Sequence, residues 1–236
     1  MRARSPEAKR RREDAILAAA ERLATLNGVR EVTVTAIADA VGMHKSAMLR
    51  YFETREDIFL RLAARAWKDW SADVCGRLTA MSPRPAPDGQ AWERAARSIA
   101  DLLARSLVIR PLFCDLLAHT PLNLERNVST ETVRAFKRVA IAEAAQISTV
   151  LRTVAPIAPG QAHNVVTTAT SMAGALWQMA APGTRLRSFY ESDPELSHSI
   201  VDVEPRLADL LNALLTGYAA IAARPDHTRG APNDTA

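Results

Sequence analysis

The short stretch 33–52 constrains the fold more than any other part of the chain. It contains two apolar segments separated by Gly42, with Ile37 on the first and with Met48 and Phe52 four residues apart on the second. Each segment predicts one face of a helix. Helices shorter than about 12 to 15 residues are marginal in water, so both must pack against the rest of the chain. A tight turn at Gly42, where glycine tolerates a positive φ, then predicts a helix-turn-helix.

The second short helix carries small and basic residues outside its apolar face, namely Lys45, Ser46, Ala47, Leu49 and Arg50. Alanine and serine allow a close approach to a DNA groove, and Lys45 can reach a guanine edge or a phosphate. A helical hairpin with an exposed lysine has the same pattern without any DNA. The spacing favours DNA binding over this second interpretation.

Apolar residues elsewhere recur at helical spacing, and runs with strict apolar-polar alternation are absent. Aromatic residues make up only 5% of the chain, a composition that favours helices over strands. Proline and glycine break the pattern at 81–90 and 156–160. We therefore predict an all-α fold of about nine helices. Besides the two short ones, the helices are expected from about Pro6 to Asn27, after Thr54, and at 92–108, 111–119, 130–154, 161–180 and 205–223, with a polar connection at 182–202.

The charge is uneven along the chain. The whole sequence has 30 lysine and arginine residues against 26 aspartate and glutamate residues, a net charge of +4. Residues 1–12 alone carry six basic residues and one acidic residue, a local net charge of +5. A basic segment at a chain end suits a polyanion such as DNA, although a solvated, disordered tail has the same composition. No stretch approaches about 18 consecutive apolar residues, so neither a membrane span nor a signal peptide is predicted.

Residues that could carry chemistry are scattered. The two cysteines, Cys75 and Cys114, have no CxxC or Cys/His spacing near them, and we expect buried, reduced thiols in a cytoplasmic protein. The sequence contains no HExxH, P-loop or GxSxG motif. The histidines stand far apart, at His44, His119, His163, His198 and His227. We therefore predict no enzyme activity, no metal site and no cofactor.

The residues around the predicted helix-turn-helix carry a more specific pattern. The stretch VTVTAIADAVGMHKSAMLRYFETREDIFLRL contains a threonine cap, an Ile-Ala pair, a glycine turn, a short helix, an aromatic pair and a basic-acidic opening of the next helix. This order resembles the N-terminal signature of the TetR family of bacterial transcriptional repressors, over roughly residues 10–65. The resemblance implies a homodimer that binds a palindromic operator in double-stranded DNA.

The resemblance also implies which residues contact DNA. Thr33 and Thr35 fall where the family contacts phosphates from the start of its second helix. The base-facing part of the recognition helix then holds His44, Lys45, Ser46 and Ala47, and Tyr51 and Arg55 fall at further backbone-contact positions. Leu49 departs from the pattern, because family members usually carry a tyrosine there whose hydroxyl bonds a phosphate. Leucine cannot donate, so this contact is expected to be lost, or replaced by packing on a sugar or a thymine methyl group.

Four parts of the chain are predicted: a basic flexible arm at 1–9, a DNA-binding domain at 10–65, an effector-binding and dimerisation domain at 66–223, and a disordered tail at 224–236. The arm is expected to enter a flanking minor groove. The resemblance implies that the last two helices form a symmetric four-helix dimer interface, although an apolar stripe is also compatible with simple core packing. The predicted interface residues are Val165, Ala169, Met172, Leu176, Leu207, Leu211, Leu214 and Tyr218.

Aromatic residues and methionines outside the DNA-binding part predict a cavity for a small apolar or amphipathic effector. The candidate lining residues are Trp67, Trp70, Trp92, Phe113, His119, Asn123, Asn127, Phe136, Met172 and Gln178. Ordinary core packing is the favoured explanation for each of the aromatic residues taken singly, and His119 can instead cap a helix end. We expect a repressor that leaves its operator when the effector binds. A constitutive or protein-controlled regulator without a small-molecule ligand is the alternative, and an all-helical enzyme is a remote one.

Overall fold

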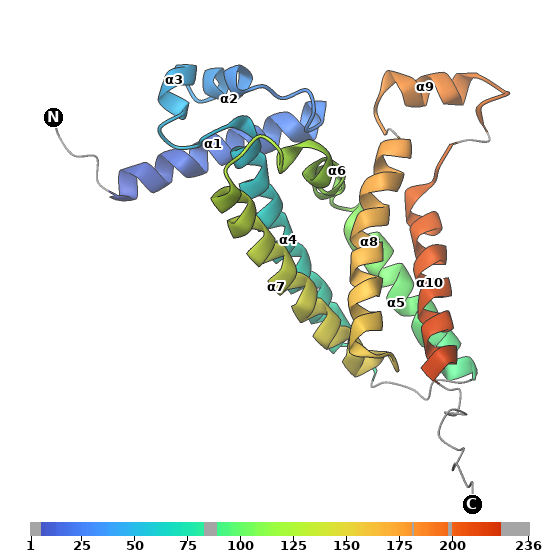
Figure 1. Ribbon diagram of the computed structural model, residues 1–236. Coiled ribbons are helices and arrows are strands. Elements are labelled where there is room, and N and C mark those ends of the chain that lie inside the picture. Colours follow the sequence, from blue (N-terminus) through green and yellow to red (C-terminus); the bar gives the residue numbers. More distant parts are fainter. Residues whose placement is uncertain (1–5, 83–88, 181, 198–199, 223–236) are drawn as a thin grey trace, which may run out of the picture.

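The structure is a computed structural model that describes residues 6–82, 89–180, 182–197 and 200–222. This part of the chain contains ten α-helices, a short π-helix and no strand (Figure 1), which confirms the predicted all-α fold. The elements are α1 (Pro6–Asn27), α2 (Val34–Ala40), α3 (Lys45–Met48), α4 (Arg55–Thr79), α5 (Gln90–Val108), α6 (Pro111–His119), η1 (Thr120–Leu124), α7 (Thr130–Val154), α8 (Pro159–Ala180), α9 (Arg185–Ser192) and α10 (Val203–Ala222).

Hydroxyl side chains open four of these helices. Thr33, Thr54, Ser129 and Thr184 each accept a hydrogen bond from the backbone N–H three residues further on, at 3.1 or 3.2 Å. Such caps satisfy one of the N–H groups that the first helical turn leaves without a partner. The predicted starts of α4 and α7 agree with two of these caps.

One helix was not predicted. Helix α9 lies within the expected polar connection at 182–202, where Thr184 caps it and Arg187 pairs with Glu191 at 2.6 Å. Helix α1 has the expected bounds, so residues 6–9, which the predicted flexible arm included, belong to its first turn. Residues 1–5 of the predicted arm and the predicted tail lie outside the described residues.

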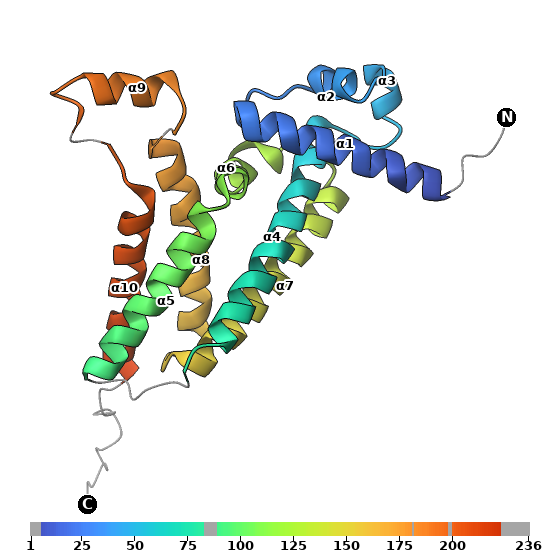
Figure 2. The same cartoon turned by 180° about the vertical axis from the view of Figure 1, so that it is seen from behind.

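The arrangement of the helices divides the molecule into a head and a body. Figure 1 shows α4 and α7 side by side, with α5, α8 and α10 forming a second group next to them. Helix α1 crosses one end of α4, and α2 and α3 lie on its outer side; Figure 2 shows the same order from behind. We call α1, α2 and α3 the head, and α4 to α10 the body. The short helix α6 contacts α1, α4 and α8, so it connects the head with both groups of body helices.

Three aromatic rings fill the space between α4 and α6. The ring centroids of Trp67, Trp70 and Phe113 lie 5.5 to 5.8 Å apart, and Trp70 Nε1 donates a hydrogen bond to Ser106 Oγ of α5 at 2.8 Å. All three rings belong to buried residues. They were predicted as part of a ligand cavity, and here Trp67 packs edge-on against Trp70 and Phe113, as aromatic rings in a close-packed interior do. Phe113 also lines a cavity between α1, α4 and α6.

Helices α6 and α8 touch at Gly174. A Cβ atom placed on Gly174 would lie 2.8 Å from the backbone N of Ala118 and 3.1 Å from its Cα. Side-chain carbons do not approach main-chain atoms so closely, because protein interiors are already close-packed. Glycine therefore permits the observed distance between these two helices and fixes α6 against α8.

The predicted dimer interface needs correction. Five of its residues have side chains that are at most 4% exposed within the single chain: Val165, Ala169, Leu176, Leu207 and Leu211. They lie on the inner faces of α8 and α10, which pack on each other and on α5, α6 and α7. A side chain that its own chain already covers cannot form the contact surface for a second copy, so these five residues belong to the core. Met172, Leu214 and Tyr218 are half-buried and lie at the edge of the outer face.

Candidate DNA-binding site and its junction with the body

The turn between α2 and α3 is held by a backbone hydrogen bond and a shared apolar face. Gly42 has a φ of 63°, which glycine adopts without strain, and the N–H of Met43 bonds back to α2 at 2.9 Å. Ile37, Met48 and Phe52 are at most 3% exposed. They share a core with the inner residues of α1, which are Ile16, Leu17, Ala19, Ala20 and Ala24. Packing therefore stabilises two helices that are too short to be stable alone.

The opposite face of α3 is open to solvent. His44, Lys45 and Ser46 are exposed at its N-terminal end, and Ala47 is half-buried beside them. His44 precedes the helix in an extended conformation, and its ring makes no capping hydrogen bond. This face offers a cation, a hydroxyl group and an imidazole around a small residue. Such groups can bond to base edges in a major groove.

Further predicted contact residues lie around this face. Thr33 and Thr35 are exposed at the start of α2, and Thr33 Oγ1 accepts from the N–H of Ala36, which leaves its hydroxyl proton to donate. Leu49 follows α3 directly and is 55% exposed, whereas Tyr51 is half-buried against the core. Leu49 is therefore placed where a side chain can touch DNA, and its predicted contact stays a prediction.

Arg55 has a different role from the predicted phosphate contact. Its guanidinium group donates to the carbonyl oxygen of Val32, at 2.5 Å from Nε, and to that of Val29, both in the loop between α1 and α2. It also pairs with Glu56 at 3.2 Å and lies over the ring of Phe59, 4.6 Å from the centroid. Only 19% of its side chain is exposed. Arg55 therefore holds the head against α4. Its guanidinium group was expected to reach DNA, but it is bonded to two backbone carbonyl oxygens and lies over an aromatic ring.

Basic residues continue along the first turns of α1. Lys9, Arg10, Arg11 and Arg12 are exposed, and two of them form ion pairs of 3.8 and 3.9 Å with glutamates on the same helix. Surface pairs of this kind contribute only about 0–1 kcal/mol. The N-terminal end of α1 points away from the body in Figure 1, so this positive charge lies at the outer end of the head.

A buried carboxylate joins the head to the body. Asp115 of α6 accepts a hydrogen bond through Oδ2 from the N–H of Val29 at 2.6 Å, and one through Oδ1 from Gln178 Nε2 of α8 at 2.7 Å. The ring Nε2 of His119 lies 3.4 Å from the same Oδ1, and Asn123 Nδ2 lies 3.4 Å from His119 Nδ1. One side chain on α6 therefore links the loop that precedes α2 with α8.

The electrostatics of this group are consistent with a charged carboxylate. Burial raises the pKa of Asp115, but hydrogen bonds from His119, Val29 and Gln178 outweigh it and hold the pKa below its ordinary value. The C=O of Val29 is in turn bound by Arg55 of α4. We call this arrangement the Val29 clamp: α6 holds the N–H of Val29 and α4 holds its C=O. The loop that precedes α2 is thereby bonded to both α4 and α6.

The junction contains polar residues predicted for ligand binding, His119, Asn123 and Gln178, together with Asp115, which the sequence analysis missed. The available signal was an acidic residue inside the apolar run PLFCDLLAH, because a buried charge requires partners. The remaining candidates lie elsewhere: Trp92 is buried in α5, Phe136 is buried in α7, Met172 is half-buried in α8, and Asn127 is exposed before α7. The described residues thus do not form the predicted single cavity lined by the whole set.

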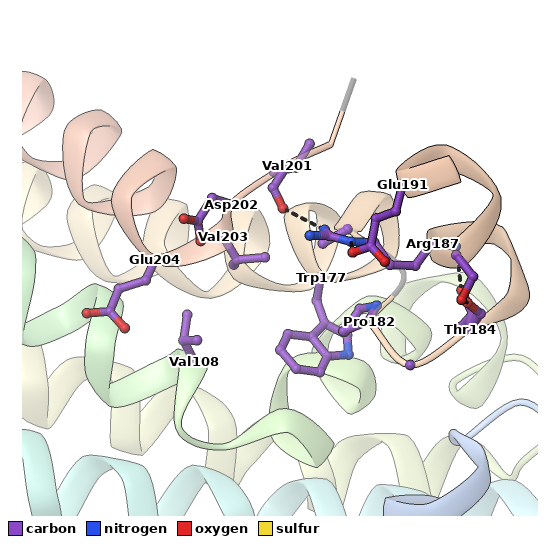
Figure 3. Close-up of a pocket in the computed structure, with 13 residues that line it drawn as sticks. Val108, Trp177, Pro182, Thr184, Arg187, Glu191, Val201, Asp202, Val203 and Glu204 are labelled. Atoms are coloured by element: carbon purple, nitrogen blue, oxygen red, sulfur yellow. Dashed lines mark hydrogen bonds and ion pairs between the residues drawn. The ribbon is translucent and has the colours of Figure 1, made fainter. Parts of the chain in front are cut away.

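Three cavities of similar size lie around α6 and α8. One of about 440 Å³ lies between α1, α4 and α6. A second of about 430 Å³ lies between α8, α9 and α10, where Figure 3 shows Trp177 next to Pro182 and Arg187 bonded to the C=O of Val201. The third, also about 430 Å³, lies where α1, α6 and α8 meet and has Asp115 in its wall. We call this third cavity the junction cleft.

Two further features are absent from the described part of the chain. No group of three or more histidine, cysteine, aspartate or glutamate residues there is placed to hold a metal ion. None of the helices in those ranges combines the length and apolar character that crossing a membrane requires.

The all-helical fold and the exposed face of α3 are together typical of a DNA-binding transcriptional regulator. Residues 16–62 match the family described as bacterial regulatory proteins, tetR family, and residues 64–222 match the family described as tetracyclin repressor-like, C-terminal domain. The chain belongs to the TetR family.

Solved structures show the same fold. The fatty acid degradation regulator FadR from Bacillus halodurans is 15% identical, over 92% of this chain and 97% of that chain, with a TM-score of 0.53. A protein from Mesorhizobium loti assigned to the TetR family of transcriptional regulators is also 15% identical, over 90% of this chain and 97% of that chain, with a TM-score of 0.53. A comparison with curated proteins gives no match. At this identity the two structures are similar to the chain in fold alone.

Proposed function

We propose that two copies of this chain form a repressor that binds a palindromic operator through α2 and α3 and leaves it when a small molecule binds. The observation that carries the proposal is the two-sided helix-turn-helix, buried at Ile37 and Met48 and exposed at Lys45 and Ser46. An exposed recognition helix on a packed support is the geometry that major-groove readers need. The proposed DNA contacts are Thr33, Thr35, His44, Lys45, Ser46, Ala47, Leu49 and Tyr51.

The outer face of α10 supports dimerisation. Leu210 is 37% and Ile221 is 59% exposed, and Ala213 and Gly217 are exposed between them. Their spacing places the four residues on one face of the helix. The outer face of α8 adds small or flexible residues, which are Ser171, Ala175 and Met179. An apolar stripe with small residues lets helices of a second copy approach closely, and a twofold pair of heads matches a palindrome.

The Val29 clamp suggests how a signal in the body reaches the DNA. The two heads of a dimer can engage successive major grooves only at one separation, about 34–36 Å for sites one helical turn apart. Because α4 and α6 both hold Val29, a ligand that favours a different position of these helices also favours a different head separation. The ligand shifts the equilibrium only by its differential affinity for the two states.

A second function, a regulator without a small-molecule ligand, is supported by the packing of Trp67, Trp70 and Phe113. These rings fill part of the space between α4 and α6. The cavities at the edge of α6 support the ligand-responsive form instead, because each is within the range of about 300–1,000 Å³ that is usual for ligand sites. We favour the ligand-responsive form since one of these cavities has Asp115 in its wall.

Footprinting of DNA upstream of the protein's own coding region, combined with light scattering, tests the proposal. We expect a symmetric protected segment and a solution mass of twice the 25.7 kDa of one chain. The double variant Leu210→Glu, Ile221→Glu should be monomeric and lose the footprint, because charges on the outer face of α10 oppose pairing. Ile141→Glu on α7, at a residue that is 63% exposed, is the matched control and should keep both properties. A monomeric wild-type protein, or a footprint that survives in the double variant, contradicts the dimer.

A further inference from the structure

The junction cleft is bordered by the head and by two body helices. Its walls come from the end of α1 and the following loop, from Asp115 and His119 of α6, and from Trp177 and Gln178 of α8. The same Trp177 also lines the neighbouring cavity under α9, where Figure 3 shows its ring next to Pro182. The cleft therefore combines a polar wall with an aromatic one.

Asp115 gives the cleft its chemical character. The residue is 9% exposed, and its two strong hydrogen bonds come from neutral donors, the N–H of Val29 and the amide of Gln178. The single ion-pair partner recorded for it among the described residues is His119, at 3.4 Å. At the rim, Glu31 and Arg30 add one charge of each sign. This buried carboxylate thus has hydrogen-bond donors but lacks a permanently charged partner, and a cation would add a stronger, charge-assisted hydrogen bond.

The side-chain amide of Gln178 is hydrogen-bonded to Oδ1 of Asp115, the oxygen that a cation would bind. The Gln178 side chain is exposed and donates a neutral hydrogen bond to Oδ1, whereas Oδ2 is kept by Val29. Hydrogen bonds from charged donors to carboxylates are about twice as strong as those between neutral groups. An incoming cation can therefore displace the Gln178 amide and leave the bond to Val29 in place. Trp177 provides a flat apolar and cation-attracting wall for the rest of such a molecule.

We propose that the junction cleft binds a small organic cation, with an amidinium, guanidinium or primary ammonium group on Asp115 and an apolar body on Trp177. That this occupant acts as the effector rests on the function proposed above. By taking Oδ1 from Gln178, the cation removes one hydrogen bond between α6 and α8. The occupant thereby changes the bonding of the same carboxylate that holds the N–H of Val29 in the head.

Calorimetric titration of the whole protein, without DNA, with benzamidine and with its neutral analogue benzamide tests the proposal. We expect benzamidine to bind about tenfold more tightly than benzamide, since a charged donor adds more than about 1 kcal/mol over a neutral one. Asp115→Asn should abolish the preference. Asp101→Asn, an exposed carboxylate on α5 outside the cleft, is the matched control and should keep it.

Gln178→Ala gives a second, independent readout that does not remove the carboxylate. Because the native competitor for Oδ1 is lost, this variant should bind benzamidine several-fold more tightly than the wild type. Equal binding of the two probes, a preference that survives in folded Asp115→Asn, or weaker binding in Gln178→Ala would overturn the proposal. Operator binding is measured separately: a protein that binds its operator but not benzamidine refutes the cation site alone, and one that binds benzamidine but no DNA refutes the proposed function.

Discussion

Replacing Gly174 with alanine tests the contact between α6 and α8. The new Cβ would lie 2.8 Å from the backbone N of Ala118, and backbone atoms cannot rotate away as a side chain can. Forcing an extra carbon into a packed interior costs about 1–3 kcal/mol. Alanine also favours a helix by about 1 kcal/mol over glycine, which partly offsets this cost. The matched control is Gly76→Ala on α4, where a Cβ meets nothing within 4 Å and only the helix gain applies.

The two alanine variants are compared by thermal unfolding at one protein concentration. Because the helix-propensity gain is common to both, their difference isolates the packing cost of about 1–3 kcal/mol, or about 2–12 °C in Tm for a chain of this size. Gly76→Ala should be the more stable of the two. Since α6 carries Asp115, Gly174→Ala should also alter operator affinity, whereas Gly76→Ala should not. Equal Tm values for the two variants would refute the close approach of α6 to α8.

Three further predictions concern single side chains. Leu49→Tyr should tighten DNA binding by about two- to tenfold with little sequence preference, because one added phosphate hydrogen bond contributes about 0.5–1.5 kcal/mol. Weaker binding of this variant in an anisotropy titration would mean that the leucine makes its own contact with DNA. Asp115→Ala should lower the free energy of unfolding by about 1–3 kcal/mol near neutral pH, because the buried N–H of Val29 loses its acceptor. The pKa of Asp115 is lowered in the folded protein, so the stability that its carboxylate adds is present above the ordinary pKa and is lost as the pH falls through the lowered value. Denaturant titrations in which Asp115→Ala lowers the free energy of unfolding equally at acidic and neutral pH would contradict this prediction. Burial raises the pKa of Cys114 to about 12 and also raises the pKa of Cys75. Neither thiol should therefore react with iodoacetamide in the native protein at about pH 8. Rapid labelling detected by mass spectrometry would show that the core opens.

Local signals in the sequence were sufficient for most of the helices. The caps at Thr54 and Ser129 and the glycine turn at Gly42 act through neighbouring residues, so their effect is readable without the fold. Helix α9 was missed because its stretch is polar overall, although Thr184 and the pair Arg187 with Glu191 are ordinary helix signals.

Roles that depend on contacts between distant segments could not be read in this way. Arg55 binds carbonyl groups more than twenty positions earlier in the chain, and Asp115 bonds to Val29 and Gln178 across 86 and 63 positions. Helical spacing also does not say which part of a broad apolar stripe faces a second chain. Leu207 and Leu211 were therefore predicted for the dimer interface, although both are buried against the body and their neighbour Leu210 is the exposed one.

The salt dependence of DNA binding tests the central claim most directly. We compare the wild type with Lys45→Ala on the recognition face and with Lys68→Ala, an exposed lysine on α4 away from that face. Each lost phosphate contact lowers the slope of log K against log salt by about 1. In a dimer, α3 lies on DNA in both copies, so Lys45→Ala removes two phosphate contacts if Lys45 binds phosphate. This variant should weaken binding and lower the slope by about 2, whereas Lys68→Ala should leave the affinity and the slope unchanged. An unchanged affinity and slope in Lys45→Ala, or equal losses in both variants, would contradict the placement of α3 against DNA.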